Sequence, residues 1–337
     1  MPLRMTRPRG LWTSLGLLTS IALSACATTS SERPWTKLDQ VPLTFTEPVV
    51  VPLIQDGAES RPVVGLKLNG HECRFLVDTL SALSFVVPEC AEEVGLTIGP
   101  VALPDGSAAI VRSGTGKSVR IDHYGGVKCL ELGSVAIEDA VLFLNGDAPM
   151  LRSKEFQGVL GYDLLKRLPV VFDLEHHALH FLPPGTDRAG IEAYLTAERF
   201  GAGGWSCGAI EFDGGFYVPI TVDGALDPMV LMFDTGCNVT ALPEAFVTKL
   251  GLETADDELH ELNFVGGTVM VRHYRWEFEL MGFRMNTTVP TLPREFAILG
   301  MNALGNFNFV LDGPGKMLWL RPILVEPATD AAPAQAR

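Results

Sequence analysis

The sequence has few charged residues, few basic residues and few cysteines for a chain of 337 residues. Only 20% of its residues are charged, and 26 Lys and Arg against 40 Asp and Glu give a net charge of −14. A surface of this sign does not attract nucleic acid or anionic lipid headgroups. Six cysteines are too few for a disulfide scaffold, and 47% hydrophobic residues are too many for a disordered chain. We therefore expect one large folded domain or two of ordinary size.

Long apolar runs are also missing, apart from one near the N-terminus. Leu11–Ala25 is apolar over 15 residues, which is short for a membrane span, and it follows Arg4, Arg7 and Arg9. This order is typical of a secretory signal peptide. The run ends in Leu23-Ser24-Ala25-Cys26, which resembles the lipobox of bacterial lipoproteins and implies acylation of Cys26. A plain secretory signal with an incidental cysteine is the alternative.

Export as a lipoprotein would change both the charge and the compartment. Loss of the three signal arginines leaves 23 basic against 40 acidic residues, a net charge of −17. We expect a protein anchored by lipid and facing the periplasm, without access to cytosolic ATP or NAD. Ala27 after the lipid cysteine favours the outer membrane, by analogy with enterobacterial sorting.

The cysteines that follow the signal are odd in number, so at least one stays free or pairs with another chain. An exported protein can form disulfides, but the sequence leaves their pairing open. No Cys/His spacing suggests a metal site. The five are Cys73, Cys90, Cys129, Cys207 and Cys237.

Glycine and proline are abundant, with 34 and 23 copies, and they separate short apolar runs such as Val63–Leu68 and Tyr217–Val222. This pattern predicts an all-β fold. Asn69-Gly70 and Asp223-Gly224 lie between such runs and predict tight hairpins. Short helices are predicted over Pro88–Val94 and Pro243–Leu250, each of which begins with proline and stops before a glycine.

An internal repeat relates the two halves of the chain. Apolar strands end in Asp78-Thr79 and in Asp234-Thr235, and a hydroxyl follows each Asp by six residues, at Ser84 and Thr240. An apolar-Gly motif comes later in each half, at Leu160-Gly161 and Leu299-Gly300. We interpret the chain as two homologous lobes. The predicted parts are a signal peptide (1–26), a tether (27–40), an N-terminal lobe (41–183), a linker (184–207), a C-terminal lobe (208–325) and a disordered tail (326–337).

These motifs resemble those of retropepsin-like aspartic proteases, in which an apolar strand ends in Asp-Thr-Gly and an apolar-Gly motif follows. The second lobe matches with Asp234-Thr235-Gly236, whereas the first has Leu80 where the family has glycine. The resemblance extends over most of the chain. It implies an all-β protein of two retropepsin-like β-barrel lobes with short helices, fused in one chain that acts as a monomer.

The resemblance also implies a chemistry. Two carboxylates a few ångströms apart cannot both ionise, so they share one proton and serve as acid and base toward water; aspartic proteases are the standard example. Asp78 and Asp234 would be the catalytic pair, and Thr79 and Thr235 would hydrogen-bond across the lobe interface. Gly236 would let the backbone approach the substrate. No cofactor is expected, and the substrate would be a peptide or an unfolded protein.

Leu80 leaves three interpretations open. The site could cleave peptides with altered specificity, or the chain could be a non-catalytic peptide-binding lipoprotein on the same fold. The alignment of the first lobe could also be wrong. The bulky side chain of Leu80 must either avoid the substrate channel or fill part of it, and we also expect backbone strain of about 1–2 kcal/mol where glycine would be free. Hairpins over Ile110–Val119 and Phe264–Tyr274 are the expected flaps over the substrate.

Competing motifs carry less information. Gly204–Gly208 fits the Gly-x-Ser-x-Gly pattern of serine hydrolases but lacks the strand before it and the helix after it. Gly116-Lys117-Ser118 lacks the first glycine of a phosphate-binding loop. His176, His177 and His180 are expected to face solvent on a hairpin rather than to bind metal. Cys237 is expected to be a small buried side chain, because no motif places a histidine beside it.

Overall fold

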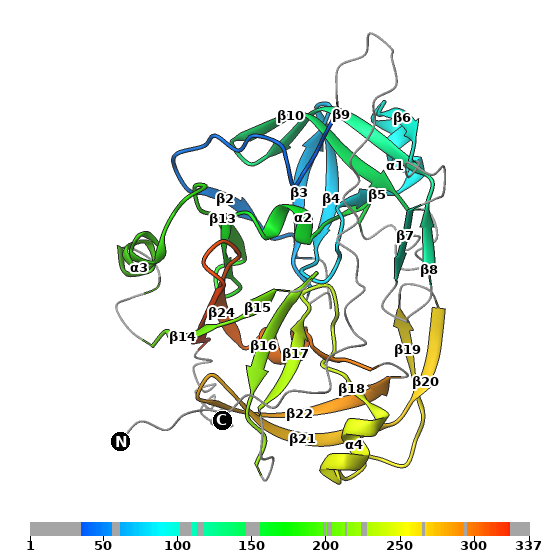
Figure 1. Cartoon of the computed structure of the whole chain (residues 1–337), viewed down its shortest axis with the longest axis vertical. Coiled ribbons are helices and arrows are strands. Elements are labelled where there is room, and N and C mark those ends of the chain that lie inside the picture. The colour runs from blue at the N-terminus through cyan, green and yellow to red at the C-terminus, as the bar shows by residue number, and fades with distance from the viewer. Residues whose placement is uncertain are drawn as a thin grey trace, which may run out of the picture.

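The structure, a computed structural model, describes residues 35–55, 61–101, 109–112, 118–145, 156–197, 200, 204–212, 214–223, 228–264, 267–292 and 295–323. These residues form an all-β protein with short helices, so the predicted fold class is confirmed. We call the described residues up to 183 the N-terminal half, and those from 204 onward the C-terminal half (Figure 1). No helix among the residues described is long and apolar enough to cross a membrane.

The N-terminal half is built around a closed barrel. Its eight-stranded sheet has the order β1-β10-β5-β11-β4-β3-β9-β6, and an additional pairing of β10 with β9 closes six of these strands into a ring. The strands are β1 (Thr36–Lys37), β3 (Val63–Leu68), β4 (His71–Val77), β5 (Phe85–Val86), β6 (Thr97–Pro100), β9 (His123–Leu132), β10 (Val135–Leu144) and β11 (Gly158–Leu160). Asn69 and Gly70 form the β3–β4 turn with φ angles of 51° and 86°, which Asn and Gly tolerate best.

The C-terminal half repeats the central part of this pattern in two smaller sheets. One has the order β15-β16-β17-β23 and the other β18-β22-β21. The strands are β15 (Glu211–Phe212), β16 (Phe216–Ile220), β17 (Met229–Phe233), β23 (Ala297–Leu299), β18 (Leu242–Pro243), β21 (His273–Leu280) and β22 (Phe283–Leu292).

A six-stranded sheet joins the halves, in the order β14-β25-β24-β12-β13-β2. Its strands are β2 (Val49–Pro52), β12 (Pro169–Asp173), β13 (Ala178–Phe181), β14 (Ser206–Ala209), β24 (Phe307–Asp312) and β25 (Met317–Pro322). β12 pairs with β24 across the boundary, and the rings of Phe172 and Phe309 stack there with centroids 4.4 Å apart. One hydrophobic core contains Val77 and Leu160 from the first half together with Phe233 and Leu299 from the second. The two halves therefore share one core.

Two separate hairpins lie on the same side of the view, at the right of Figure 1. They are β7 (Ala109–Arg112) with β8 (Ser118–Ile121), and β19 (His260–Phe264) with β20 (Gly267–Val271). The first hairpin overlaps the expected flap Ile110–Val119, whereas the second begins at His260, four residues before the expected flap Phe264–Tyr274, and ends at Val271. The tips at 113–117 and 265–266 lie outside the described residues.

The short helices follow the sequence closely. α1 (Pro88–Glu93) and α4 (Glu244–Leu250) lie where proline and glycine predicted them, and α4 ends at Gly251 with φ 62°. α2 (Tyr162–Leu165) and α5 (Met301–Leu304) each follow the glycine of an apolar-Gly motif.

Two predicted boundaries differ from the structure. Residues 36–40 were assigned to the tether, but β1 pairs with β10 and Leu38 is only 1% exposed. Arg167 donates hydrogen bonds of 2.6 Å to the carbonyls of Leu38 and Val41, which fixes this segment on the barrel. The predicted linker 184–207 contains helix α3 (Arg188–Ala197), and Ile191 and Leu195 are buried on its inner face. Residues 1–34 and 324–337 lie outside the described part of the chain.

Candidate active site

The two Asp-Thr motifs stand at the ends of equivalent strands. Asp78 follows β4, whose neighbour β11 runs parallel to it with Leu160 opposite Val77. Asp234 follows β17, whose parallel neighbour β23 places Leu299 opposite Phe233. The Asp78 N–H donates to the carbonyl of Leu160 over 2.9 Å, and the Asp234 N–H to that of Leu299 over 3.0 Å. Each apolar-Gly strand thus fixes the end of the strand that carries the aspartate.

The structure brings the carboxyls of Asp78 and Asp234 within hydrogen-bonding reach of each other. Asp234 is 6% exposed and Asp78 is half-buried. Asp78 Oδ1 accepts hydrogen bonds from the N–H groups of Leu80 and Ser81, at 2.8 and 2.9 Å. Asp234 Oδ1 accepts one from the Gly236 N–H at 2.9 Å. One oxygen of each carboxyl is therefore held by the backbone of its own loop.

The electrostatics of Asp78 favour its neutral form. Burial raises the pKa of the Asp78 carboxyl and outweighs the opposing effects. Those effects are the two loop N–H groups, the positive charge of Arg61 and the hydrogen bond with Asp234. A carboxyl in this state can hold a proton beside a second carboxylate.

Thr79 and Thr235 join the two motifs by reciprocal hydrogen bonds. The Thr79 hydroxyl donates to the Phe233 carbonyl over 2.7 Å and accepts from the Thr235 N–H over 3.0 Å. The Thr235 hydroxyl donates to the Val77 carbonyl over 2.6 Å and accepts from the Thr79 N–H over 3.2 Å. Both threonines are fully buried. These four bonds hold the two aspartate loops at one level.

The hydroxyls of Ser84 and Thr240 connect the aspartate loops to the apolar-Gly turns. The Gly161 N–H donates to the Ser84 hydroxyl over 2.9 Å, and the Gly300 N–H donates to the Thr240 hydroxyl over 3.0 Å. Both hydroxyl residues are buried. The sequence motif is therefore a connected set of contacts from the strand ends to the apolar-Gly turns.

Sequence reasoning did not single out Asp163 and Asn302, which occupy matching places two residues after Gly161 and Gly300. Asp163 accepts from the Ser84 N–H and hydroxyl, at 2.9 and 2.6 Å. Asn302 Oδ1 accepts from the Thr240 N–H at 2.6 Å. Burial raises the pKa of Asp163 to about 6, despite the hydrogen bonds that favour its charged form. The repeat could have indicated this role, because Asp163 and Asn302 stand at matching positions and both side chains can accept a hydrogen bond from a backbone N–H.

Leu80 does not distort the first loop. Its N–H makes the same hydrogen bond to Asp78 that Gly236 makes to Asp234, and its φ is not positive. The expectation of backbone strain at Leu80 was therefore wrong, because this loop needs no left-handed residue. The Leu80 side chain packs against a cluster of the C-terminal half: Ala241, Val271, Leu292 and Ile298.

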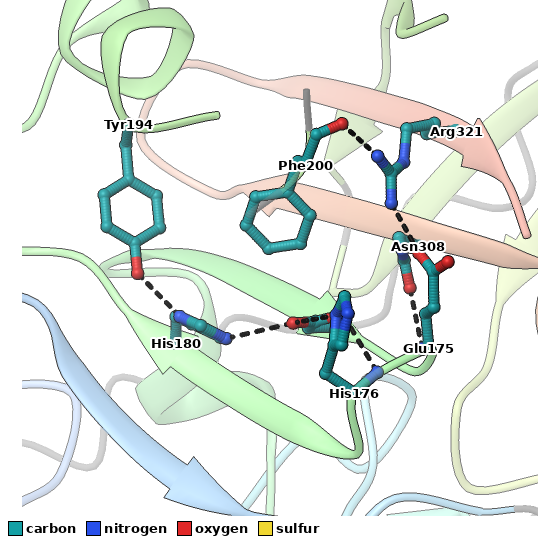
Figure 2. Close-up of polar contacts among 8 residues, drawn as sticks. Glu175, His176, His180, Tyr194, Phe200, Asn308 and Arg321 are labelled. Carbon is teal, nitrogen blue, oxygen red and sulfur yellow. Dashed lines mark hydrogen bonds and ion pairs between the residues drawn. The ribbon is translucent and has the colours of Figure 1, made fainter. Parts of the chain in front are cut away.

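The prediction that His180 faces solvent was also wrong. His180 is 1% exposed, with Nδ1 2.6 Å from the Tyr194 hydroxyl and Nε2 3.5 Å from Asp173 (Figure 2). Helix α3 carries Tyr194 and covers this face of the joining sheet, where Val171, Val310 and Trp319 pack against Ile191 and Leu195. His176 and His177 are exposed, as expected.

The same network contains an unusually placed aspartate. Asp173 is fully buried, and burial alone would raise the pKa of its carboxyl. The close approach of His180 and the hydrogen bonds with His176 outweigh that effect, and the pKa of Asp173 is lowered. Glu175 links Asn308 to Arg321 beside it, and Arg321 also donates to the Phe200 carbonyl (Figure 2). The group ties the hairpin of β12 and β13 to β24 and β25.

The remaining candidates lie in strand β14, next to the second aspartate loop, or outside the described residues. Ser206, the serine of the Gly-x-Ser-x-Gly pattern, begins strand β14 and donates to the Met281 carbonyl over 2.8 Å. Cys237 is half-buried, and its thiol donates to the Val239 carbonyl. Cys26 lies outside the described residues, as does the Gly116-Lys117 part of the weak phosphate-loop match.

Comparison with known families gives a match that includes the second motif. Residues 218–303 match the family model described as Aspartyl protease. The match supports the aspartic protease family. It contains Asp234, Thr240 and Gly300, but it does not reach the first motif at Asp78. No curated protein matches the chain.

Proposed function

We propose that this protein is an aspartic endopeptidase in which Asp78 and Asp234 activate a water molecule. The proximity of the two carboxyls, at the ends of equivalent strands, carries the proposal. One carboxylate takes a proton from water, whose oxygen forms a bond with the carbonyl carbon of the peptide. The protonated carboxyl donates to the carbonyl oxygen, and the amide nitrogen receives a proton as the carbon–nitrogen bond breaks.

The supporting residues account for the stability of this arrangement. Thr79 and Thr235 keep the aspartates level through their reciprocal bonds, and Ser84 and Thr240 hold the loops onto the apolar-Gly turns. The proton shared by the pair is favoured by burial of Asp78, so the pH dependence of activity would report the pair and not either residue alone.

The pair is supplied by one chain. We propose that the two halves are duplicated lobes, each contributing one Asp-Thr motif, so that a monomer contains a complete site. The similarity of the hydrogen bonds around Asp78 and Asp234 supports a common origin.

We further propose that the protein is exported and held by an acylated Cys26, facing the periplasm at the outer membrane. Its substrates would then be peptides or unfolded proteins of that compartment. Labelling with a fatty-acid analogue, compared between the wild type and Cys26→Ser, tests the anchor. Equal labelling of both proteins would contradict it.

Cleavage of an unfolded protein from acid to neutral pH tests the activity. Asp78→Asn and Asp234→Asn should each lower the rate by roughly 100-fold or more. Asp223→Asn is the matched control, because the Asp223 side chain is 94% exposed and removal of its charge should leave the rate unchanged. Equal rates for the wild type and Asp234→Asn would contradict the mechanism. Binding of the unfolded protein without cleavage by the wild type would favour the non-catalytic alternative.

A further inference from the structure

A cluster of metal-binding side chains lies at the base of the β19–β20 hairpin. His260 is the first residue of β19, and His273 is the first residue of β21, directly after the hairpin. Asp256 lies in the loop between α4 and β19. One ligand atom from each of the three residues lies within 4.8 Å of the others. The cluster therefore connects the two ends of the hairpin with the loop before it.

The contacts within the cluster are close. His260 Nε2 lies 3.0 Å from both carboxylate oxygens of Asp256. The rings of His260 and His273 are parallel, at 2° to each other, with centroids 4.3 Å apart.

We propose that Asp256, His260 and His273 bind a divalent transition-metal ion, with Zn²⁺ as the best match. Two imidazole nitrogens and one carboxylate are typical ligands of Zn²⁺ and are unsuited to Mg²⁺ or Ca²⁺, which prefer oxygen. A fourth position would be open to water. The site is distinct from the aspartate pair and does not depend on the proposed peptidase activity.

The geometry needs only a small movement to hold such an ion. Ligands about 2.1 Å from a tetrahedral ion lie roughly 3.4 Å from one another. His260 Nε2 and the Asp256 oxygens, which are 3.0 Å apart, would separate slightly, and the most distant ligand atoms, within 4.8 Å, would approach by about 1.4 Å at most. The side chains of Asp256 and His260 are 41% and 35% exposed, which leaves them room to turn. Bound metal would fix the ends of the β19–β20 hairpin, which overlaps the expected flap Phe264–Tyr274.

The N-terminal half offers a matched control. His123 is the first residue of β9 and is followed by Tyr124, as His273 begins β21 and is followed by Tyr274. The residue at the base of its hairpin is Ala109, which pairs with Ile121 as His260 pairs with Val271. The first hairpin therefore has one histidine where the second has two, and His123 should not bind metal.

The test is titration of the chelator-treated full chain with ZnCl₂, followed by calorimetry, and with CoCl₂, followed by visible absorption. We expect one ion per chain, Co²⁺ bands of a low-coordinate nitrogen–oxygen site, and a higher unfolding temperature with Zn²⁺. His260→Gln and His273→Gln should each weaken binding at least tenfold, while His123→Gln should bind as the wild type does. Circular dichroism of each variant shows whether it is folded.

Three results would overturn the proposal. One is the absence of saturable binding by the folded wild type, which would leave Asp256 and His260 as an ordinary ion pair. Another is binding that survives the double substitution of His260 and His273. The last is a loss of binding in His123→Gln as large as that in His273→Gln. Failure of peptide cleavage would not bear on any of them.

Discussion

Gly236 in the C-terminal half lies directly against the carboxyl of Asp78 in the N-terminal half. A Cβ atom at Gly236 would lie 2.3 Å from Asp78 Cγ and 2.4 Å from Asp78 Oδ2, well inside contact distance. Leu80, at the matching place in the first motif, has room for its side chain among apolar residues of the C-terminal half. The two motifs therefore differ in their tolerance of a side chain, although the N–H groups of Leu80 and Gly236 each donate to the aspartate of their own loop.

Substitution of Gly236 by alanine should displace Asp78. A shift of about 1 Å in a reacting group costs roughly 100-fold in rate, so we expect a loss of that size in the cleavage of an unfolded protein. Leu80→Gly should keep the aspartate pair in place and retain cleavage. It should lower the free energy of unfolding by about 2–4 kcal/mol, because it removes a packed side chain. Rates and urea unfolding of both variants check these expectations.

Leu80→Gly and Gly236→Ala also distinguish the contact between Gly236 and Asp78 from a requirement for the Asp-Thr-Gly sequence itself. If the Asp-Thr-Gly sequence itself were required in each half, Leu80→Gly would raise activity, whereas the contact between Gly236 and Asp78 predicts no such gain. A rate for Gly236→Ala within twofold of the wild type would contradict the contact that we describe.

Removal of the Thr79 hydroxyl should destabilise the boundary between the halves. Thr79→Val leaves the Phe233 carbonyl and the Thr235 N–H without their partner in a buried place. We expect the free energy of unfolding to fall by about 2–4 kcal/mol. Thr79→Ser keeps both hydrogen bonds and loses one methyl group, so its cost should be about 1 kcal/mol. Denaturant unfolding measures both, and equal losses would show that the hydroxyl is not the important group.

The pKa of Asp163 predicts a stability that depends on pH. A pKa of about 6 in the folded state, against 3.8 in the reference state, means that folding favours the protonated carboxyl. The protonated carboxyl therefore contributes fully to the free energy of unfolding below about pH 4, and this contribution is lost as the pH rises through 6. At neutral pH the free energy of unfolding should be lower by roughly 3 kcal/mol. Asp163→Asn should remove the loss, because Asn302 already makes the equivalent contact with Thr240.

Unfolding of this variant is best followed from pH 4 to pH 8. At pH 4 the wild type and Asp163→Asn should be equally stable, and at pH 8 the variant should be the more stable. Asp223→Asn is a suitable control, since its exposed side chain should leave the pH profile unchanged. Parallel profiles for the wild type and Asp163→Asn would contradict the role assigned to burial.

The sequence predicts the parts of the fold that rest on local rules. The turn at Asn69-Gly70 and the helices α1 and α4 follow from turn and capping chemistry. The repeated spacing of the motifs indicated Asp78 and Asp234 as the candidate pair. The burial of His180 could not be read from the sequence, because it depends on α3 packing over the sheet. That helix was missed, although Asp187 accepts a hydrogen bond from the Gly190 N–H at its start. Asp256, His260 and His273 are brought together by a loop and two strands, and no local pattern shows this.

Cys73 and Cys90 should form a disulfide if the protein is exported as proposed. Their sulfur atoms are 3.6 Å apart, and both side chains are buried. The hydrogen bond with Cys90 lowers the pKa of the Cys73 thiol, which favours the thiolate that attacks an oxidant. The two thiols would pass two electrons and two protons to a disulfide of a protein oxidant, and a bond would join their sulfurs.

Mass spectrometry of the exported protein, digested without reduction, checks this pairing. One cross-linked pair of peptides containing Cys73 and Cys90 is expected, lighter by two hydrogen atoms than the reduced peptides. Cys129, Cys207 and Cys237 should react with a thiol reagent after unfolding. Because the bond would close a loop between residues 17 apart, Cys73→Ala should lower the free energy of unfolding by about 3 kcal/mol under oxidising conditions. With a reductant present that difference should shrink, whereas an unchanged difference, or five reactive thiols in the exported wild type, would show that the pair stays reduced.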